Sequence, residues 1–212
     1  MEDTTESFTL NDLIAYVAEI FIVLPETEEN SDEVMFPNLI TRGIHCFSRI
    51  NNILFSSRLK ELTVAKQEDI GKEISKILFY VSSLAYLLDV PNDSFNEESL
   101  IGFSEEFDQV YIHDAIMASC LGIKHFIEIS EYLYLPPIEE ETNTEDPPGP
   151  PTKLSSFPVS IPEELLESKD DTTGPEQLIA PLFTIVLMIC DRLELSFENL
   201  VYNASLLEIE KL

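Results

Sequence analysis

The chain has no tryptophan, only six glycines and only three cysteines among its 212 residues. So few glycines leave little room for a glycine-rich phosphate-binding loop, and neither a Gly-x-Ser-x-Gly elbow nor a His-Glu-x-x-His motif is present. The cysteines, Cys46, Cys120 and Cys190, stand singly inside apolar stretches, which predicts buried reduced thiols and neither disulfides nor a Cys-x-x-Cys metal site. We therefore expect no catalytic residues and no metal site.

Basic residues are also scarce, because 12 Lys and Arg against 40 Asp and Glu give a formal net charge of −28. This charge repels phosphate backbones and anionic lipids, so we expect no direct binding to nucleic acid or membranes. The acidic N-terminus lacks the basic region of a secretory signal. The longest uncharged apolar run, Leu178 to Cys190, is shorter than the roughly 20 residues of a membrane span. These features predict a cytoplasmic protein, or one made by a virus in an infected host cell.

The acidic excess is concentrated in three segments. Residues 1–41 carry ten acids and no Lys or Arg, residues 77–123 carry eight and none, and residues 137–176 carry eleven against two. The exception is the segment 42–76, which has seven basic residues against four acids. Ion pairs on a solvated helical face would explain this local positive charge, and so would an anion site.

Apolar residues recur at intervals of three and four, and strand signals are almost absent, which predicts an all-α fold. Thr9 or Asn11 is a suitable N-cap for the first helix. We expect helices over residues 9–24, 36–62, 68–88, 94–103, 112–135, 175–195 and 197–212, with an acidic loop at 26–33. The pattern begins again near Asp108, so two halves are predicted, 1–107 and 108–212. The second half carries an insertion rich in proline and acid at 136–175.

The segment Glu68-Asp-Ile-Gly-Lys-Glu-Ile-Ser-Lys-Ile-Leu-Phe-Tyr-Val-Ser-Ser-Leu-Ala-Tyr-Leu-Leu-Asp-Val90 resembles the third helix of the MazG-like, all-α nucleoside triphosphate pyrophosphohydrolases. In that family a Glu-x-x-Asp pair precedes an apolar segment on this helix, and the second helix carries Glu-x-x-Glu. The resemblance implies an oxygen cage for Mg²⁺, which clamps the triphosphate and helps to activate water. It also implies a helical bundle of two MazG-like halves packed as an intrachain pseudo-dimer.

In the first half most of the implied ligand positions are substituted. The second-helix motif falls on Ile44-His-Cys-Phe-Ser-Arg-Ile50, so Cys46 and Arg49 stand where the two glutamates belong. On the third helix Glu73 remains, and Lys76 replaces the aspartate. Two positive charges in place of Mg²⁺ predict a salt bridge that acts as an inert polar plug. The alternative is a phosphate site formed by Arg49, Lys72 and Lys76.

The second half resembles the family more faintly, through residues 121–133 and 182–200. Aligned in this way, His125 and Glu128 take the second-helix positions, and Leu178 and Pro181 take those of the third helix. Two ligands without a second pair are too few for a metal, so a histidine satisfied by its helix is the alternative to a metal ligand.

Loss of ligands in both halves leads us to expect a catalytically inactive MazG-like protein, a pseudoenzyme without a cofactor, that acts by binding. A protein partner with a basic surface fits the acidic chain, and nucleic-acid mimicry by a viral accessory or inhibitor protein is a specific version of this idea. One alternative is a working pyrophosphohydrolase, with Mg²⁺ held by non-standard ligands such as Glu68, Asp69, Glu73 and Glu128. Another is a protein that sequesters a nucleotide without hydrolysing it. Self-association also remains open.

Overall fold

The computed structural model describes residues 8–23, 31–57, 62–91, 94–95, 115–134 and 175–207. These residues form the helices α1 (Leu10–Val23), α2 (Asp32–Ser57), α3 (Val64–Leu87), α5 (Ala115–Tyr134), α6 (Pro175–Arg192) and α7 (Phe197–Ser205). No strand occurs in this part of the chain, so the predicted all-α class is confirmed. The helix expected at 94–103 and the insertion at 136–175 lie almost entirely outside the described residues.

Two helices begin earlier than the sequence pattern predicts. Helix α2 was expected from Phe36 but begins at Asp32, and the N–H groups of Val34 and Met35 both donate to the Ser31 carbonyl at 2.9 Å. Pro37 is therefore inside the helix, where it removes one backbone donor. Helix α3 was expected from about Glu68 but begins at Val64. The reason is that Thr63 acts as its N-cap and accepts from the Lys66 N–H at 3.4 Å.

The first helix begins where the sequence predicted. The Thr9 side chain accepts a hydrogen bond from the Asp12 N–H at 3.2 Å, and the Asp12 carboxylate accepts from the Thr9 N–H at 2.8 Å. These reciprocal hydrogen bonds satisfy two backbone N–H donors at the start of α1, as in a capping box. Asp12 is also favoured there by the helix dipole.

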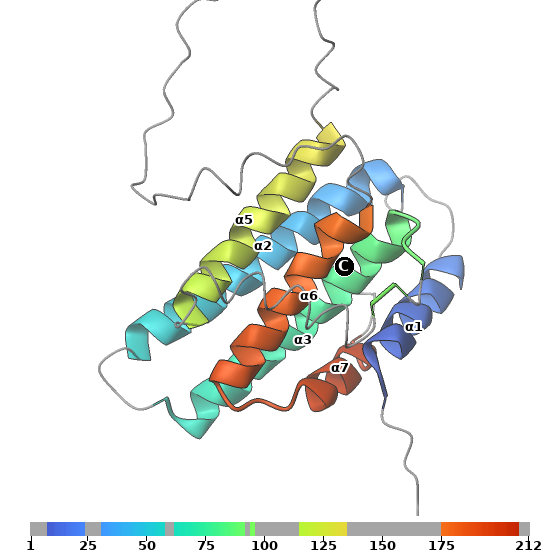
Figure 1. The fold of residues 1–212 in the computed structure, drawn as a ribbon. Coiled ribbons are helices and arrows are strands. Elements are labelled where there is room, and N and C mark those ends of the chain that lie inside the picture. The colour runs from blue at the N-terminus through green and yellow to red at the C-terminus, as the bar shows by residue number, and fades with distance from the viewer. Residues whose placement is uncertain are drawn as a thin grey trace, which may run out of the picture.

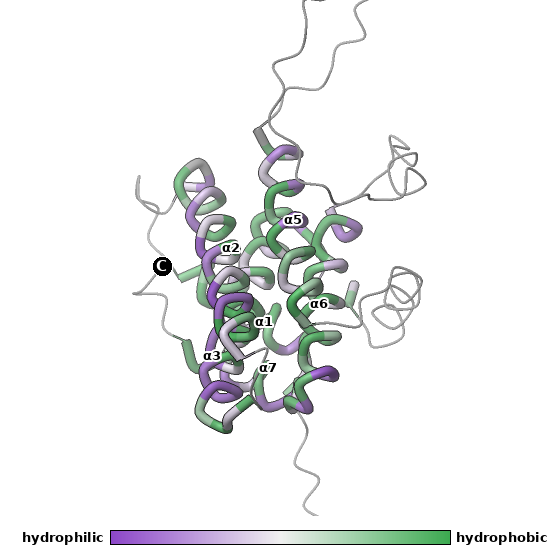
Figure 2. Tube along the Cα trace, turned by 90° about the vertical axis from the view of Figure 1, so that its left-hand side faces the viewer, coloured by the Kyte–Doolittle hydropathy of each residue, from purple (hydrophilic) through white to green (hydrophobic). Residues whose placement is uncertain are grey.

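Four long helices, α2, α3, α5 and α6, lie roughly side by side, and the shorter α1 and α7 cover one edge of α3 (Figure 1). Helix α2 packs on both α3 and α5, and α6 packs on both α5 and α3. Each helix turns its hydrophobic face inward (Figure 2). The largest buried side chains include Phe47, Phe79, Phe126 and Phe183, one from each long helix. The two predicted halves thus share one apolar core.

Helices α3 and α6 end in the same way. Asp89 and Glu194, 105 positions apart, both adopt positive φ, at 56° and 54°. The residues around them repeat the same backbone hydrogen bonds: Leu88 to Leu84, Asp89 to Tyr86 and Val90 to Ala85 after α3, and Leu193 to Ile189, Glu194 to Asp191 and Leu195 to Cys190 after α6. Such bonds satisfy the last helical carbonyls, and the left-handed residue reverses the chain.

The crossing of α2 and α5 is also built from a repeated pattern. Gly43-Ile-His-Cys-Phe47 on α2 corresponds to Gly122-Ile-Lys-His-Phe126 on α5. A Cβ atom added at Gly43 would overlap the ring of Phe126, and one added at Gly122 would overlap the ring of Phe47. The two rings lie 6.0 Å apart at 59°. On each helix, therefore, a glycine without a side chain leaves the space that the phenylalanine ring of the other helix fills.

Candidate functional site

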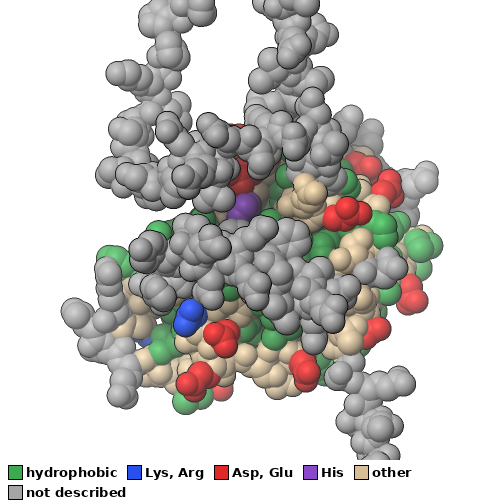
Figure 3. Space-filling view, viewed as in Figure 1, with side chains coloured by type: hydrophobic (Ala, Val, Ile, Leu, Met, Phe, Trp, Pro, Cys, Tyr) green, Lys and Arg blue, Asp and Glu red, His purple; other side chains and the backbone are tan. Residues whose placement is uncertain are grey.

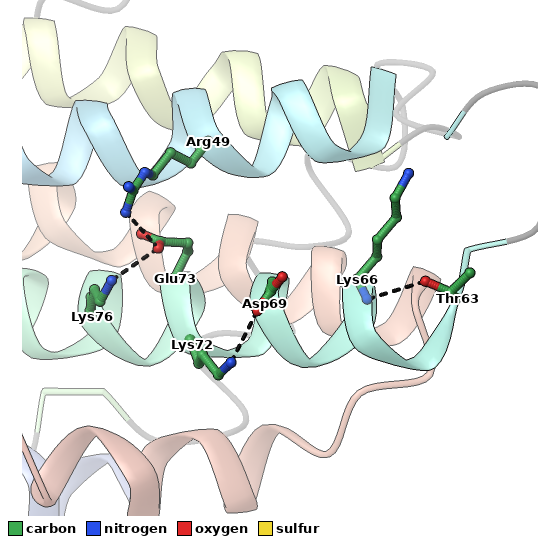
Figure 4. Close-up of polar contacts among 7 residues, drawn as sticks. All are labelled: Arg49, Thr63, Lys66, Asp69, Lys72, Glu73 and Lys76. Carbon is green, nitrogen blue, oxygen red and sulfur yellow. Dashed lines mark hydrogen bonds and ion pairs between the residues drawn. The ribbon is translucent and has the colours of Figure 1, made fainter. Parts of the chain in front are cut away.

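Among the described residues, the most heavily charged contact between helices joins α2 to α3. Arg49 reaches across from α2, and its Nη1 lies 3.0 Å from Oε1 of Glu73 on α3 (Figure 4). Lys76, one helical turn after Glu73, places its Nζ 2.9 Å from the same oxygen. Two cations from two helices therefore converge on one carboxylate oxygen.

The three groups form two layers. Glu73 is buried, with 7% of its surface exposed, whereas the side chain of Arg49 is 66% exposed and that of Lys76 is 34% exposed. A buried carboxylate is costly unless opposite charge and hydrogen bonds compensate it. The cations provide that compensation and lie between Glu73 and solvent.

Cys46 completes the surroundings of the carboxylate from α2. Burial alone would raise the pKa of Glu73, but hydrogen bonds from Lys76 and from the Cys46 thiol, with the charges of Lys76 and Arg49, lower its pKa overall. The pKa of Cys46 is raised, first by burial and then by Glu73. At neutral pH the carboxylate is thus charged and the thiol is protonated, so Cys46 is a poor nucleophile.

Sequence reasoning missed two members of this cluster, Arg42 and Tyr80. Burial raises the pKa of Tyr80, and a hydrogen bond with Arg42 and the charges of Arg42 and Lys76 oppose that rise. Arg42 lies two turns before Arg49 on α2, and Tyr80 lies one turn after Lys76 on α3, but spacing along a single helix does not show that Arg42 and Tyr80 meet. We define the polar seam as the six residues Arg42, Cys46, Arg49, Glu73, Lys76 and Tyr80.

Lys72 takes no part in the contact at Glu73. It pairs with Asp69 at 3.0 Å, both side chains are exposed, and Lys72 points away from α2 (Figure 4). Of the three residues considered as phosphate ligands, the structure therefore brings together Arg49 and Lys76 alone.

The positions predicted to correspond in the second half are arranged differently. On α5, His125 Nδ1 lies 2.8 Å and Lys124 Nζ lies 3.0 Å from the two oxygens of Glu128. The hydrogen bond from His125 is the main reason that the pKa of Glu128 falls to about 2; burial opposes the shift and Lys124 adds to it. On α6, Leu178 is half-buried and Pro181 is buried, and neither offers a ligand atom.

No group of three or more His, Cys, Asp or Glu side chains that could hold a metal ion occurs in the described residues. Within the same residues, no helix is long and apolar enough to cross a membrane.

The surface charge differs between the edges of the bundle. Helices α1 and α7 contain acidic residues and neither Lys nor Arg, whereas α2 and α3 hold five of the seven Lys and Arg that the structure describes. In Figure 3, acidic side chains recur along the right and lower edges of the visible face, and basic ones are few. Most of the described positive charge thus lies on α2 and α3, the two helices that form the polar seam.

No model of a protein family, no curated protein and no solved structure matches this chain.

Proposed function

We propose that this protein is a non-catalytic relative of the MazG-like pyrophosphohydrolases and acts by binding a protein partner. The observation that carries the proposal is the convergence of Arg49 and Lys76 on Glu73. In the family's arrangement this place belongs to Mg²⁺ and further carboxylates. Here two fixed cations neutralise the one remaining acid, so the contact holds α2 to α3 without metal.

The two-half arrangement is part of the same proposal. Residues 1–107 and 108–212 would be two MazG-like halves, packed as an intrachain pseudo-dimer. Its support is the repetition of local structure: the left-handed residues Asp89 and Glu194 end α3 and α6 alike, and the glycine–phenylalanine contacts of α2 and α5 are reciprocal. A two-fold relation between halves produces such reciprocal contacts.

Hydrolysis by non-standard ligands is the competing function, and the ion pairs argue against it. Mg²⁺ requires an octahedral set of oxygen ligands. Of the acids considered for that role, Asp69 pairs with Lys72, Glu73 pairs with Arg49 and Lys76, and Glu128 pairs with His125 and Lys124. Each pair would have to break before these acids could share a metal.

The acidic edge of α1 and α7 supports a partner with a basic surface. Opposite charges accelerate encounter and select partners, and this effect weakens as salt screens it. A steep fall in partner affinity with rising salt is expected, and salt-insensitive hydrophobic docking would contradict this part of the proposal. Mimicry of nucleic acid, in a cytoplasmic or virus-infected setting, is the specific version of such binding.

The first experiment is calorimetric titration of the full chain with Mg²⁺ and then with nucleoside triphosphates, followed by a pyrophosphate-release assay. We expect neither Mg²⁺ binding nor turnover. Mg²⁺-dependent release of pyrophosphate would establish the competing enzyme function.

A gain-of-function variant tests the family relationship directly. Cys46→Glu, Arg49→Glu and Lys76→Asp together recreate the four-carboxylate set and should introduce Mg²⁺ binding. The control, Asn52→Glu with Lys66→Glu and Lys72→Asp, adds the same negative charge outside the polar seam and should not. Equal Mg²⁺ binding by both variants would mean that added negative charge is sufficient for binding. The result would then give no support to the family relationship.

A further inference from the structure

We propose that Arg49 and Lys76 form a metal-independent binding site for a phosphate-type oxyanion on the surface of the polar seam. It rests on the proposed function in one respect, since both require that Mg²⁺ does not occupy this place. It adds a ligand class to a site otherwise described as a structural ion pair.

The cations outnumber the acid at the site. Because Arg49 Nη1 and Lys76 Nζ both contact Glu73 Oε1, their separation cannot exceed the sum of the two distances, 5.9 Å. The two positive charges of Arg49 and Lys76 face the single negative charge of Glu73, so the three groups together carry a net positive charge. Arg42 adds a third cation two turns away on α2, where it interacts with Tyr80. An anion would relieve this local repulsion.

Arg49 and Lys76 keep N–H donors on their solvent-exposed sides that do not bond to Glu73. A guanidinium has five N–H donors and an ammonium has three. The bond to Glu73 engages only Nη1 of Arg49, whose side chain is 66% exposed, and Lys76 remains 34% exposed. The fork of Arg49 can therefore hold one edge of an oxyanion while Lys76 contacts another of its oxygens.

The accessible chemistry is that of an anion site. Glu73 Oε2 is buried and has no hydrogen-bond partner among the described residues, so a cation from solvent cannot approach it without movement of its neighbours. The nitrogen atoms of Arg49 and Lys76 are the groups that a solvent-borne ligand meets first. The chain as a whole has a formal net charge of −28, which repels anions, so we expect oxyanion binding where positive charge is locally in excess.

The test is calorimetric titration of the full chain with inorganic phosphate and then pyrophosphate, with a chelator present. We expect saturable binding that Arg49→Gln and Lys76→Gln each weaken by about tenfold, the effect of losing a charge-assisted contact. Lys72→Gln is the matched control, since Lys72 lies one turn away but pairs with Asp69. The phosphate affinity of the Lys72→Gln variant should stay within about twofold of that of the unmodified chain.

Glu73→Gln provides a test with the opposite sign that does not depend on removing a cation. It leaves Arg49 and Lys76 in place and deletes their shared negative charge, so phosphate should bind more tightly. Weaker binding by this variant, equal losses with Lys72→Gln and Lys76→Gln, or no binding by the unmodified chain would each overturn the oxyanion site.

Failure of this inference and failure of the proposed function are separable when the phosphate titration with chelator is compared with the Mg²⁺ titration of chelator-free samples. Absence of both phosphate and Mg²⁺ binding would overturn the oxyanion site alone. Tight Mg²⁺ binding at Glu73 would overturn both. If phosphate binds, a nucleoside triphosphate titrated under chelator identifies the source: tighter binding than pyrophosphate indicates a nucleotide, and equal binding indicates free phosphate, and either result supports the site.

Discussion

The contact at Glu73 in the polar seam and the contact at Glu128 on α5 each place two nitrogen-bearing side chains against one carboxylate, but they do so in different ways. In the seam, a buried acid of α3 is held by cations from α2 and α3, so the contact joins two helices. On α5, both partners of Glu128 come from its own helix, and α6 contributes Leu178 and Pro181. One arrangement is tertiary and buried, and the other is local and half-exposed. Positions that are aligned between the two predicted halves therefore differ in which residues carry charge and in whether that charge joins two helices.

The largest effect is expected where the halves are alike, at the crossing of α2 and α5. Gly43→Ala and Gly122→Ala should each lower the free energy of unfolding by about 1–3 kcal/mol, because the new methyl overlaps a buried phenylalanine ring. Gly71→Ala is the control with a milder contact: an added Cβ would lie 3.2 Å from Leu200 Cδ2, so that side chain must shift slightly. Alanine also gains about 1 kcal/mol in helix propensity, so the net loss should be smaller than at Gly43 or Gly122. Urea denaturation measures all three. Unequal losses at Gly43 and Gly122 would break the apparent equivalence of the halves.

The second prediction separates the halves. Lys76→Met should cost about 2 kcal/mol, because it leaves the buried Glu73 with Arg49 as its remaining cationic partner. Lys124→Met should cost at most about 0.5 kcal/mol, since both members of that pair are partly exposed. Chemical denaturation at neutral pH gives both values. Similar costs would mean that burial does not distinguish the two sites.

The third prediction again treats the halves as equal. Asp89→Gly and Glu194→Gly should each stabilise the fold by up to about 1 kcal/mol, since glycine adopts positive φ without a Cβ penalty. Glu131→Gly, at an exposed position within α5, should instead destabilise by about 1 kcal/mol. Thermal unfolding of the three variants suffices. Destabilisation at Asp89 or Glu194 would show that its carboxylate makes a contact worth more than the strain.

The smallest effect is the acid dependence of the α5 site. The folded-state pKa of Glu128 is lowered to about 2, so its ion pairs stabilise the fold above the ordinary value of 4.5 and are lost as pH falls toward 2. Because Glu128 is 39% exposed, the contribution is about 0.3–1 kcal/mol after screening. Glu128→Gln should therefore lie closer to the unmodified chain at pH 2 than at pH 6 in urea denaturation. A stability difference between the two proteins that is the same at both pH values would refute the lowered pKa of Glu128.

The helices were largely predictable because apolar spacing reports burial, and α1, α5 and α6 follow the predicted ranges closely. The early starts of α2 and α3 were missed because they depend on the Ser31 carbonyl and the Thr63 side chain, local contacts that hydrophobic spacing does not encode. A salt bridge at Glu73 was predicted from charge substitution. The roles of Arg42 and Tyr80 depend on how α2 and α3 face each other, which spacing on a single helix does not fix.

The glycine–phenylalanine crossing also bears on how quickly the chain folds. Gly43 meets Phe126, and Gly122 meets Phe47, so each contact joins residues more than seventy positions apart. Closing such long loops costs entropy before the contacts form, and high contact order slows folding. We therefore expect slower folding than in helical bundles whose neighbouring helices are consecutive in sequence. While α5 is still undocked, the face of α2 can receive α5 from a second molecule, which makes domain-swapped dimers the natural kinetic by-product of refolding at high concentration.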